Sequence, residues 1–180
     1  MTLSLVTGPS AEPLDLLDAK LHLRVDGTDE DSLIEGLIAA ARLSVEANVG
    51  LALIDQTWKW SPEKSGKTGG DSHYEIPLGP VSSIVSVSVA GQTLPPSEYS
   101  FIAGLSASVT FSNALKNSEI HIVFVAGFGQ EASDVPRDLR HAVAVLVAHW
   151  FENRVPGGLG DMGLPGSVST LLSSYRKVRL

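Results

Sequence analysis

The residues with the clearest potential for chemistry lie in one stretch, His141 to Arg154, which reads HAVAVLVAHWFENR. His149 and Glu152 are three positions apart, so on a helix they share a face and could hold the metal ion of a hydrolase. His141 lies eight residues before His149, about 12 Å along a helix, which is too far to bind the same ion. The remaining histidines belong to three other predicted elements: His22, His73 and His121.

We therefore expect His141 and His149 to lie at the edge of an apolar stripe and to form local hydrogen bonds. The sequence predicts no metal site and no cofactor. A metal-dependent hydrolase that uses His149 and Glu152 stays open as one alternative function, which would require bound metal.

Three glycine-containing motifs each lack a residue that their chemistry requires. The segment Ser65–Thr68 (SGKT) resembles the end of a phosphate-binding loop, but that motif needs a glycine where Ser61 stands. Residues 104–108 (GLSAS) begin like the nucleophile elbow of a hydrolase and end in serine instead of glycine. Residues 127–129 (GFG) lack the third glycine of a dinucleotide-binding loop, because position 132 is alanine. We interpret all three as loops or turns.

The acidic run Asp29-Glu30-Asp31 also has a structural explanation. It lacks the glycine and the closing glutamate of an EF-hand loop, so calcium binding is not indicated. Instead, Thr28 is placed to cap a helix, with Asp31 three residues later as its capping-box partner. The chain contains no cysteine, which excludes disulfides, thiol nucleophiles and zinc-thiolate sites. The sequence therefore predicts a protein that is not an enzyme.

Charge is unevenly distributed along the 180 residues. Residues 1–50 hold nine acidic and three basic residues, which supply −6 of the net charge of −7. The last five residues include Arg176, Lys177 and Arg179. This polarity argues against broad nucleic-acid binding, which needs a basic face. It suits subunits that meet head to tail or a basic tail that docks on an acidic partner, although solvated surface charge also explains it.

The hydrophobic period divides the chain into segments of different structure. Residues 14–50 follow a helical period and predict a helix pair, the second with an apolar stripe from Leu33 to Val45 and an end at Gly50. Residues 53–126 alternate with period two between Gly and Pro turns, which predicts a β-rich insertion. No apolar run reaches the length of about 18 residues that a membrane span needs, so we expect no membrane contact and synthesis in a cytoplasm.

Helical periodicity returns after the β-rich insertion. Residues 135–154 predict a long central helix with a core stripe of Leu139, Val143, Leu146, Val147 and Trp150. Its apolar surface is wider than one face, so it must be surrounded by its own domain or covered by another chain. Residues 156–166 contain five glycines and two prolines and predict a loop, and residues 167–180 predict a short helix with a basic tail. The expected fold is α+β, a helical bundle with an inserted small antiparallel β-sheet, as a single domain of residues 1–180.

The order of these elements resembles a known protein family. The helical pair, the strands introduced by IPLGPVSSIVSVSV, a strand that ends in VFVAGFG and the helix VPRDLRHAVAVLVAHWFENR look like the head-tail connector, or adaptor, proteins of tailed phages and gene transfer agents. The resemblance covers about Leu14 to Leu180. It implies a structural protein in the neck of the particle, which forms a ring, commonly of twelve copies, beneath the portal.

The resemblance further implies that such a ring extends the DNA channel, lets DNA pass without specific binding, and docks the next neck or tail component. We expect the acidic N-terminal helices to help form subunit contacts. We expect the C-terminal segment to dock on the portal protein, through Tyr175, Arg176, Lys177, Val178, Arg179 and Leu180. A stopper or tail-completion protein of the same neck is the main alternative, although a long helix that follows the strands favours an adaptor.

Overall fold

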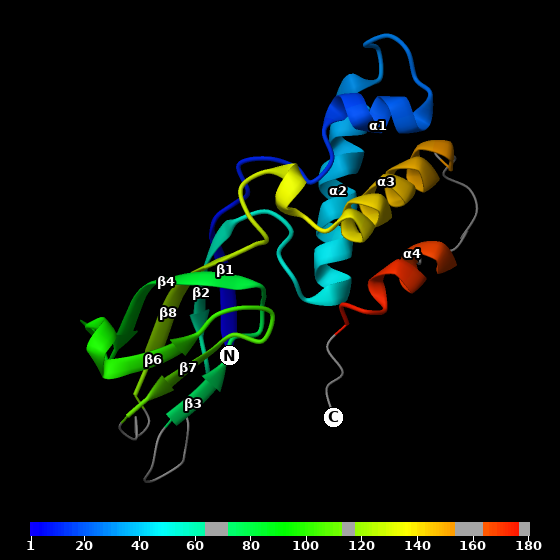
Figure 1. The fold of residues 1–180 in the computed structure, drawn as a ribbon. Coiled ribbons are helices and arrows are strands. Elements are labelled where there is room, and N and C mark those ends of the chain that lie inside the picture. The colour runs from blue at the N-terminus through cyan, green and yellow to red at the C-terminus, as the bar shows by residue number, and fades with distance from the viewer. Residues whose placement is uncertain (64–71, 113–117, 154–163, 177–180) are drawn as a thin grey trace. The chain divides into compact units, whose positions relative to one another are not determined.

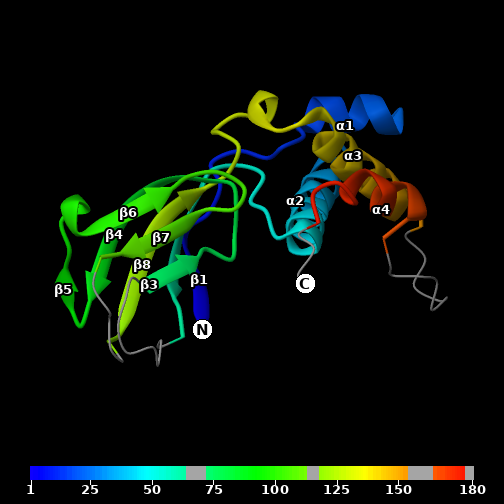
Figure 2. The same ribbon diagram turned by 60° about the horizontal axis from the view of Figure 1, so that its bottom comes forward.

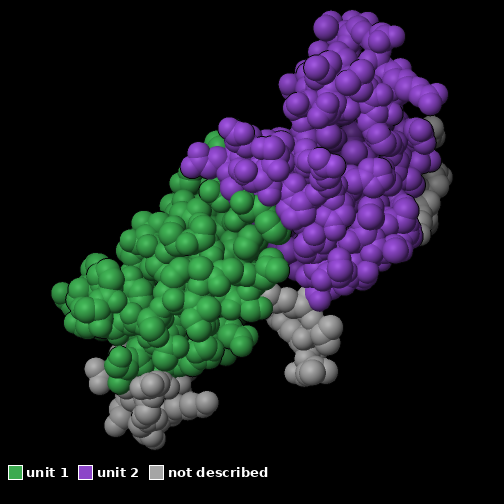
Figure 3. Space-filling view, viewed as in Figure 1, with its two compact units in different colours: residues 1–10, 55–128 green, residues 11–54, 129–180 purple. Residues whose placement is uncertain are grey.

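The computed structural model describes residues 1–63, 72–112, 118–153 and 164–176. The SGKT segment, most of the predicted loop 156–166 and the last four residues of the predicted portal-binding segment lie outside these ranges. The chain forms two compact units, coloured separately in Figure 3: unit 1 contains residues 1–10 and 55–128, and unit 2 contains residues 11–54 and 129–180. The single-domain organisation of residues 1–180 stays a prediction.

Unit 1 contains two antiparallel sheets, which confirms the β part of the predicted α+β class (Figures 1 and 2). The five-stranded sheet has the order β1-β2-β8-β4-β5, and the three-stranded sheet has the order β3-β7-β6. The strands are β1 (Thr2–Thr7), β2 (Gln56–Ser61), β3 (Ser72–Glu75), β4 (Val81–Val89), β5 (Gln92–Thr93), β6 (Tyr99–Ile102), β7 (Ser108–Phe111) and β8 (Ile120–Ala126). A short 3-10 helix, η1 (Pro96–Glu98), precedes β6.

The larger sheet is not formed by the predicted insertion alone, because strand β1 comes from the N-terminus. β1 pairs with β2, so Leu3 lies opposite Trp60 and Ser4 lies opposite Lys59. The segment TLSLVT alternates over only six residues, and its partner strand begins about fifty residues later in the chain. Local periodicity does not reveal such a distant pairing.

Alternation of side chains builds the core of unit 1. Along β8 every second residue is buried, including Ile122 and Phe124, while the residues between them are half-buried. The smaller sheet contributes buried Val109 and Phe111 on β7. Since successive side chains of a strand point to opposite faces, each sheet gives one face to this core. Aromatic contacts of Phe111 with Tyr74 and Tyr99 join the three strands of the smaller sheet.

Unit 2 is helical and contains the other part of the predicted fold. Its α-helices are α1 (Leu16–Leu23), α2 (Asp31–Val49), α3 (Arg137–Glu152) and α4 (Gly166–Leu172), and the 3-10 helix η2 (Ala132–Asp134) precedes α3. Among the described residues, no helix combines the length and the apolar character that a membrane span requires.

The central helix α3 is enclosed by its own unit. Its residues Leu139, Val143, Leu146 and Val147 are fully buried, as predicted, whereas Trp150 near its end is half-buried. Helices α1, α2 and α4 all contact α3, and α4 contributes buried Val168 and Leu172 (Figure 1). Burial of each large aliphatic side chain contributes about 1.5–3 kcal/mol. The apolar stretch HAVAVLV is therefore the core helix of unit 2.

The ends of α2 confirm one prediction and correct another. Gly50 ends the helix in the left-handed conformation, with φ of 69°, as the sequence predicts. Thr28 does not cap the N-terminus, because the helix begins at Asp31 and Glu30 occupies the cap position without a side-chain cap bond. Asp31 instead accepts a hydrogen bond from Lys20 of α1. A contact between helices has thus replaced the local capping box.

Candidate interaction surfaces

The predicted metal-binding residues of α3 make local contacts. Asn153 Nδ2 lies 3.3 Å from Nδ1 of half-buried His149, which confirms the expected local hydrogen bond, and Glu152 is exposed. His141 is exposed and meets the ring of His22 on α1 edge-on, with 6.4 Å between ring centroids. Within residues 1–63, 72–112, 118–153 and 164–176, no three His, Cys, Asp or Glu side chains are placed to hold one metal ion. Within these ranges the structure therefore contains no metal centre that a metal-dependent hydrolase, the alternative function, would need.

A contact that the sequence did not predict joins Ser61, His121 and Glu119. Ser61 Oγ lies 2.6 Å from His121 Nδ1, and His121 Nε2 lies 3.4 Å from Glu119 Oε1. These residue types also form hydrolase triads, but a triad needs free backbone N–H groups that stabilise an oxyanion. Strand β2, which carries Ser61, is paired with β1 along one edge and with β8 along the other. We interpret the Ser61–His121 contact as cross-strand hydrogen bonding on the sheet, and the His121–Glu119 contact as a local one at the start of β8.

Packing explains two glycines of the incomplete motifs. Gly104 has a φ of 115° and forms an isolated bridge with Val81, where a side chain would strain the backbone. A Cβ atom added to Gly127 would lie 2.4 Å from the backbone nitrogen of Asp55. Both glycines therefore allow turns or close backbone contact, as interpreted from the sequence.

A buried ion pair network organises the N-terminal part of unit 2. Arg42 of α2, whose side chain is 9% exposed, bonds to Glu12 Oε2 at 2.8 Å and to Glu46 Oε2 at 2.9 Å. The other oxygen of Glu46 accepts a hydrogen bond from the backbone N–H of Leu53. Burial by itself would lower the pKa of Arg42, but the Glu12 hydrogen bond and the two carboxylate charges raise it above its ordinary value. Arg42 is therefore charged and fixed, and it belongs to the fold.

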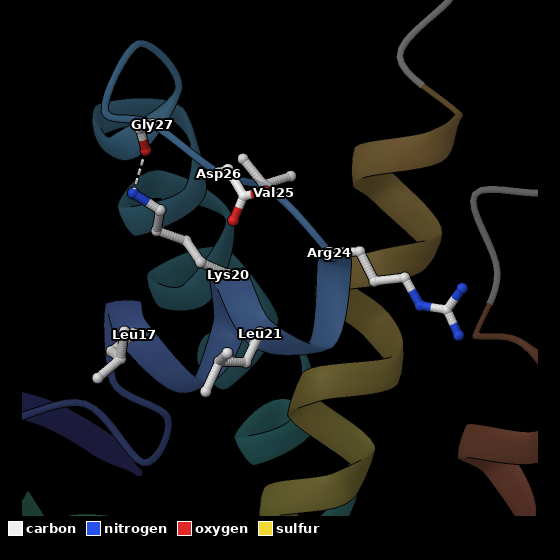
Figure 4. Close-up of a pocket in the computed structure, with 7 residues that line it drawn as sticks. All are labelled: Leu17, Lys20, Leu21, Arg24, Val25, Asp26 and Gly27. Atoms are coloured by element: carbon white, nitrogen blue, oxygen red, sulfur yellow. Dashed lines mark hydrogen bonds between the residues drawn. The ribbon is translucent and has the colours of Figure 1, made fainter.

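Helix α1 and the turn that follows it form a hollow of about 420 Å³ (Figure 4). Leu17 and Leu21 are 68% and 69% exposed, and Lys20 donates hydrogen bonds to the Gly27 carbonyl and to Asp31. Arg24 has a φ of 56°, its side chain extends away from Leu17, and it has no ion pair among the described residues. We call this surface the α1 hollow, and its lining residues are Leu17, Lys20, Leu21, Arg24, Val25, Asp26 and Gly27.

Helix α2 presents a second apolar surface. Leu33, which the sequence placed in the buried stripe, is 42% exposed, and Leu43 is 57% exposed. The rest of the predicted stripe is confirmed at Ile34, Ile38, Ala41 and Val45, which are buried, and it continues to Val49. Leu33 faces outward because the buried stripe needs only one side of the helix.

The structure describes only the beginning of the predicted portal-binding segment. Tyr175 follows α4, is half-buried, and donates a hydrogen bond of 2.9 Å to Asp138 of α3. Arg176 is exposed and lies 3.5 Å from the Ser169 hydroxyl. The remaining residues of the segment lie outside the described ranges: Lys177, Val178, Arg179 and Leu180.

Solved structures with the same fold come from gene transfer agent (GTA) particles. A chain from the neck of an empty GTA particle, computed with C6 symmetry, is 25% identical, with a TM-score of 0.80 over 100% of this chain and 97% of that one. Chains from the virion of a native GTA particle and from its neck, computed with C12 symmetry, are each 22% identical at the same coverage. Their TM-scores of 0.81 and 0.79 show a shared fold. No curated protein matches the chain.

The family comparison covers nearly the whole chain. The model of the head completion protein family matches residues 14–178, which include all four helices and all strands except β1. This family is structural and not enzymatic, so the prediction that the chain is not an enzyme is confirmed. The resemblance to head-tail connector proteins is confirmed as well. The chain therefore belongs to the head completion protein family.

Proposed function

We propose that the chain is a head-tail connector (adaptor) subunit in the neck of a phage or gene transfer agent particle. The observation that carries this proposal is the likeness, over the whole chain, to a protein from the neck of an empty GTA particle. The match of residues 14–178 to the head completion family supports the same structural role. In this role the chain extends the DNA channel and gives the next neck or tail component a surface to bind.

The functional form in this proposal is a ring beneath the portal, commonly of twelve copies. One of the similar necks was computed with C12 symmetry and another with C6 symmetry, which supports a cyclic assembly. The uneven charge of the chain is compatible with such an assembly, because the acidic N-terminal part of one partner attracts the basic tail of another. The net charge of −7 also repels DNA phosphates, so DNA passes the ring without specific binding.

In the proposed assembly the C-terminal segment, Tyr175 to Leu180, docks on the portal protein. Helix α4 packs on α3, and the Tyr175 hydrogen bond to Asp138 fixes the chain where the basic tail begins. The tail then carries Lys177 and Arg179 beyond this fixed point. In this proposal Tyr175 anchors the segment to α3, and the residues after Tyr175 contact the portal protein.

Sedimentation velocity of the purified chain, alone and with the portal ring encoded in the same genome, tests the assignment. We expect the chain to co-sediment with the portal at about one copy per portal subunit, because each portal subunit offers one equivalent site. A chain that stays monomeric and does not bind the portal would contradict the adaptor role and favour a stopper or tail-completion protein.

Deletion of residues 177–180 tests the docking segment separately. This deletion retains the Tyr175 hydrogen bond, so the melting temperature should stay within a few degrees of the wild type. Attachment to the portal should be lost. Arg137→Ala, which removes an exposed cation from α3, is the control and should leave attachment unchanged. Normal attachment of the deletion variant would refute docking by the tail.

A further inference from the structure

The outward face of α2 is apolar although nothing in the described part of unit 2 covers it. Exposed apolar or small residues follow one another at alternating spacings of three and four, which is the spacing by which one helix packs against another. A helix face that contacts only water normally carries polar and charged side chains. We call this face the outer seam, and its residues are Leu33, Gly36, Ala40, Leu43 and Ala47.

Within the described ranges, neither a close contact nor the backbone conformation requires a glycine at Gly36, in the middle of the outer seam. Glycine destabilises a helix interior relative to alanine, and it is retained where a special conformation or a close backbone contact requires it. Gly36 has no positive φ, and a Cβ atom added to it would meet nothing within 4 Å. The space above Gly36 is therefore open, and a second backbone can approach α2 closely at this point.

The α1 hollow has the complementary properties. Its apolar side chains Leu17 and Leu21 are more than two-thirds exposed, so it has room and apolar surface for an inserted leucine. Arg24 at the hollow and Glu35 beside the outer seam are both exposed, and neither has an ion pair among the described residues. One copy of the chain therefore offers an unpaired cation, and another offers an unpaired carboxylate, next to matching apolar surfaces.

We propose that the outer seam of one copy packs against the α1 hollow of a second copy. Leu33 enters the hollow, Glu35 faces Arg24, and Gly36 lets the second copy approach the α2 backbone. Because the two surfaces differ, the contact is head to tail, and every copy can repeat it around a closed ring. This inference rests on the proposed function and identifies the contact that joins the ring subunits.

Two substitutions in the full-length chain test the outer seam. Leu43→Glu places a charge in the contact, and Gly36→Met fills the open space without a clash inside the chain. We expect each to raise the concentration needed for assembly on the portal ring at least tenfold in sedimentation velocity. Leu105→Glu is the control, because Leu105 of unit 1 is 49% exposed and lies outside the seam, and it should assemble as the wild type does.

The Gly36→Met variant separates a lost contact from a lost fold. Methionine is a better helix former than glycine, so the melting temperature of the Gly36→Met variant should equal or exceed that of the wild type while assembly is weakened.

A charge exchange tests the proposed ion pair between Glu35 of one copy and Arg24 of the next. Glu35→Arg and Arg24→Glu should each weaken assembly, and the double variant should restore it. Wild-type assembly of both seam variants would overturn the inference.

If the wild-type chain does not bind the portal, the proposed function is overturned. The seam contact is then tested by self-association of the free chain. Concentration-dependent association that Leu43→Glu abolishes and Leu105→Glu preserves would support the seam contact. A wild-type chain that stays monomeric up to millimolar concentration would overturn it.

Discussion

At the scale of single residues, Tyr175 has a role that its place in the tail did not indicate. The sequence placed it in the portal-binding segment, whereas the structure uses its hydroxyl to hold the end of α4 to Asp138 of α3. Burial raises the pKa of Tyr175, and the hydrogen bond and the charge of Asp138 raise it further. The neutral phenol is thus favoured in the folded chain.

The raised pKa makes the Tyr175 contribution dependent on pH. It is fully present below the unfolded pKa of about 10 and is lost as the pH rises through the higher folded value. Tyr175→Phe should therefore lower the free energy of unfolding by about 1 kcal/mol at pH 7, and this difference should shrink above pH 10. Urea unfolding of both proteins between pH 7 and 11 measures it.

Tyr99→Phe is the control for Tyr175, because no hydrogen bond of the Tyr99 hydroxyl occurs within the described ranges. It should have the stability of the wild type at pH 7. Equal stability of Tyr175→Phe and the wild type at pH 7 would show that the hydrogen bond contributes nothing.

At the scale of elements, α2 combines three functions on one helix. One face is buried against the rest of unit 2, the Arg42 network connects the helix to Glu12 and, through Glu46, to Leu53, and the outer seam remains exposed. The network fixes both the segment that enters the helical unit and the segment that leaves it. A contact surface such as the outer seam is held more precisely when the helix that carries it is fixed in this way.

Arg42→Met should be strongly destabilising. It leaves the carboxylates of Glu12 and Glu46 without the cation that binds both, and loss of one partner of a buried pair costs about 3–5 kcal/mol. Urea unfolding at pH 7 measures the change, and Arg137→Met, at an exposed position of α3, should stay within about 0.5 kcal/mol of the wild type. If Arg42→Met lowers the free energy of unfolding by less than about 1 kcal/mol, the ion pair network does not stabilise the fold as proposed.

At the scale of the whole molecule, the chain passes between its two units several times. Unit 1 begins with residues 1–10, unit 2 follows with residues 11–54, and the chain then returns to unit 1 before it ends in unit 2. Neither unit is a continuous segment of sequence. Such interleaving favours units that fold together, because each needs chain segments on both sides of the other.

The single-domain prediction can therefore be tested by calorimetry. We expect one thermal transition whose van't Hoff and calorimetric enthalpies agree, as for a two-state domain. Arg42→Met, which acts on unit 2, should shift this whole transition to lower temperature. Two separate transitions, of which the substitution moves only one, would contradict a single cooperative domain.

The sequence by itself determined the elements with a strong local period. The stripe of Leu139, Val143, Leu146 and Val147 identified α3, and Gly50 identified the end of α2. Alternation identified β8, and the incomplete GLSAS and GFG motifs pointed to turns. These features need only neighbouring residues, because helix and strand periods and the freedom of glycine are properties of a short stretch of chain.

Only the tertiary structure decided which surfaces are buried and which distant residues meet. The pairing of β1 with β2, the contact of Ser61 with His121 and the binding of Arg42 to Glu12 each join residues at least thirty positions apart. Leu33 lies outside the core although it is as apolar as its buried neighbour Ile34. An apolar side chain favours burial, but the packing of the other helices decides which face of α2 is covered.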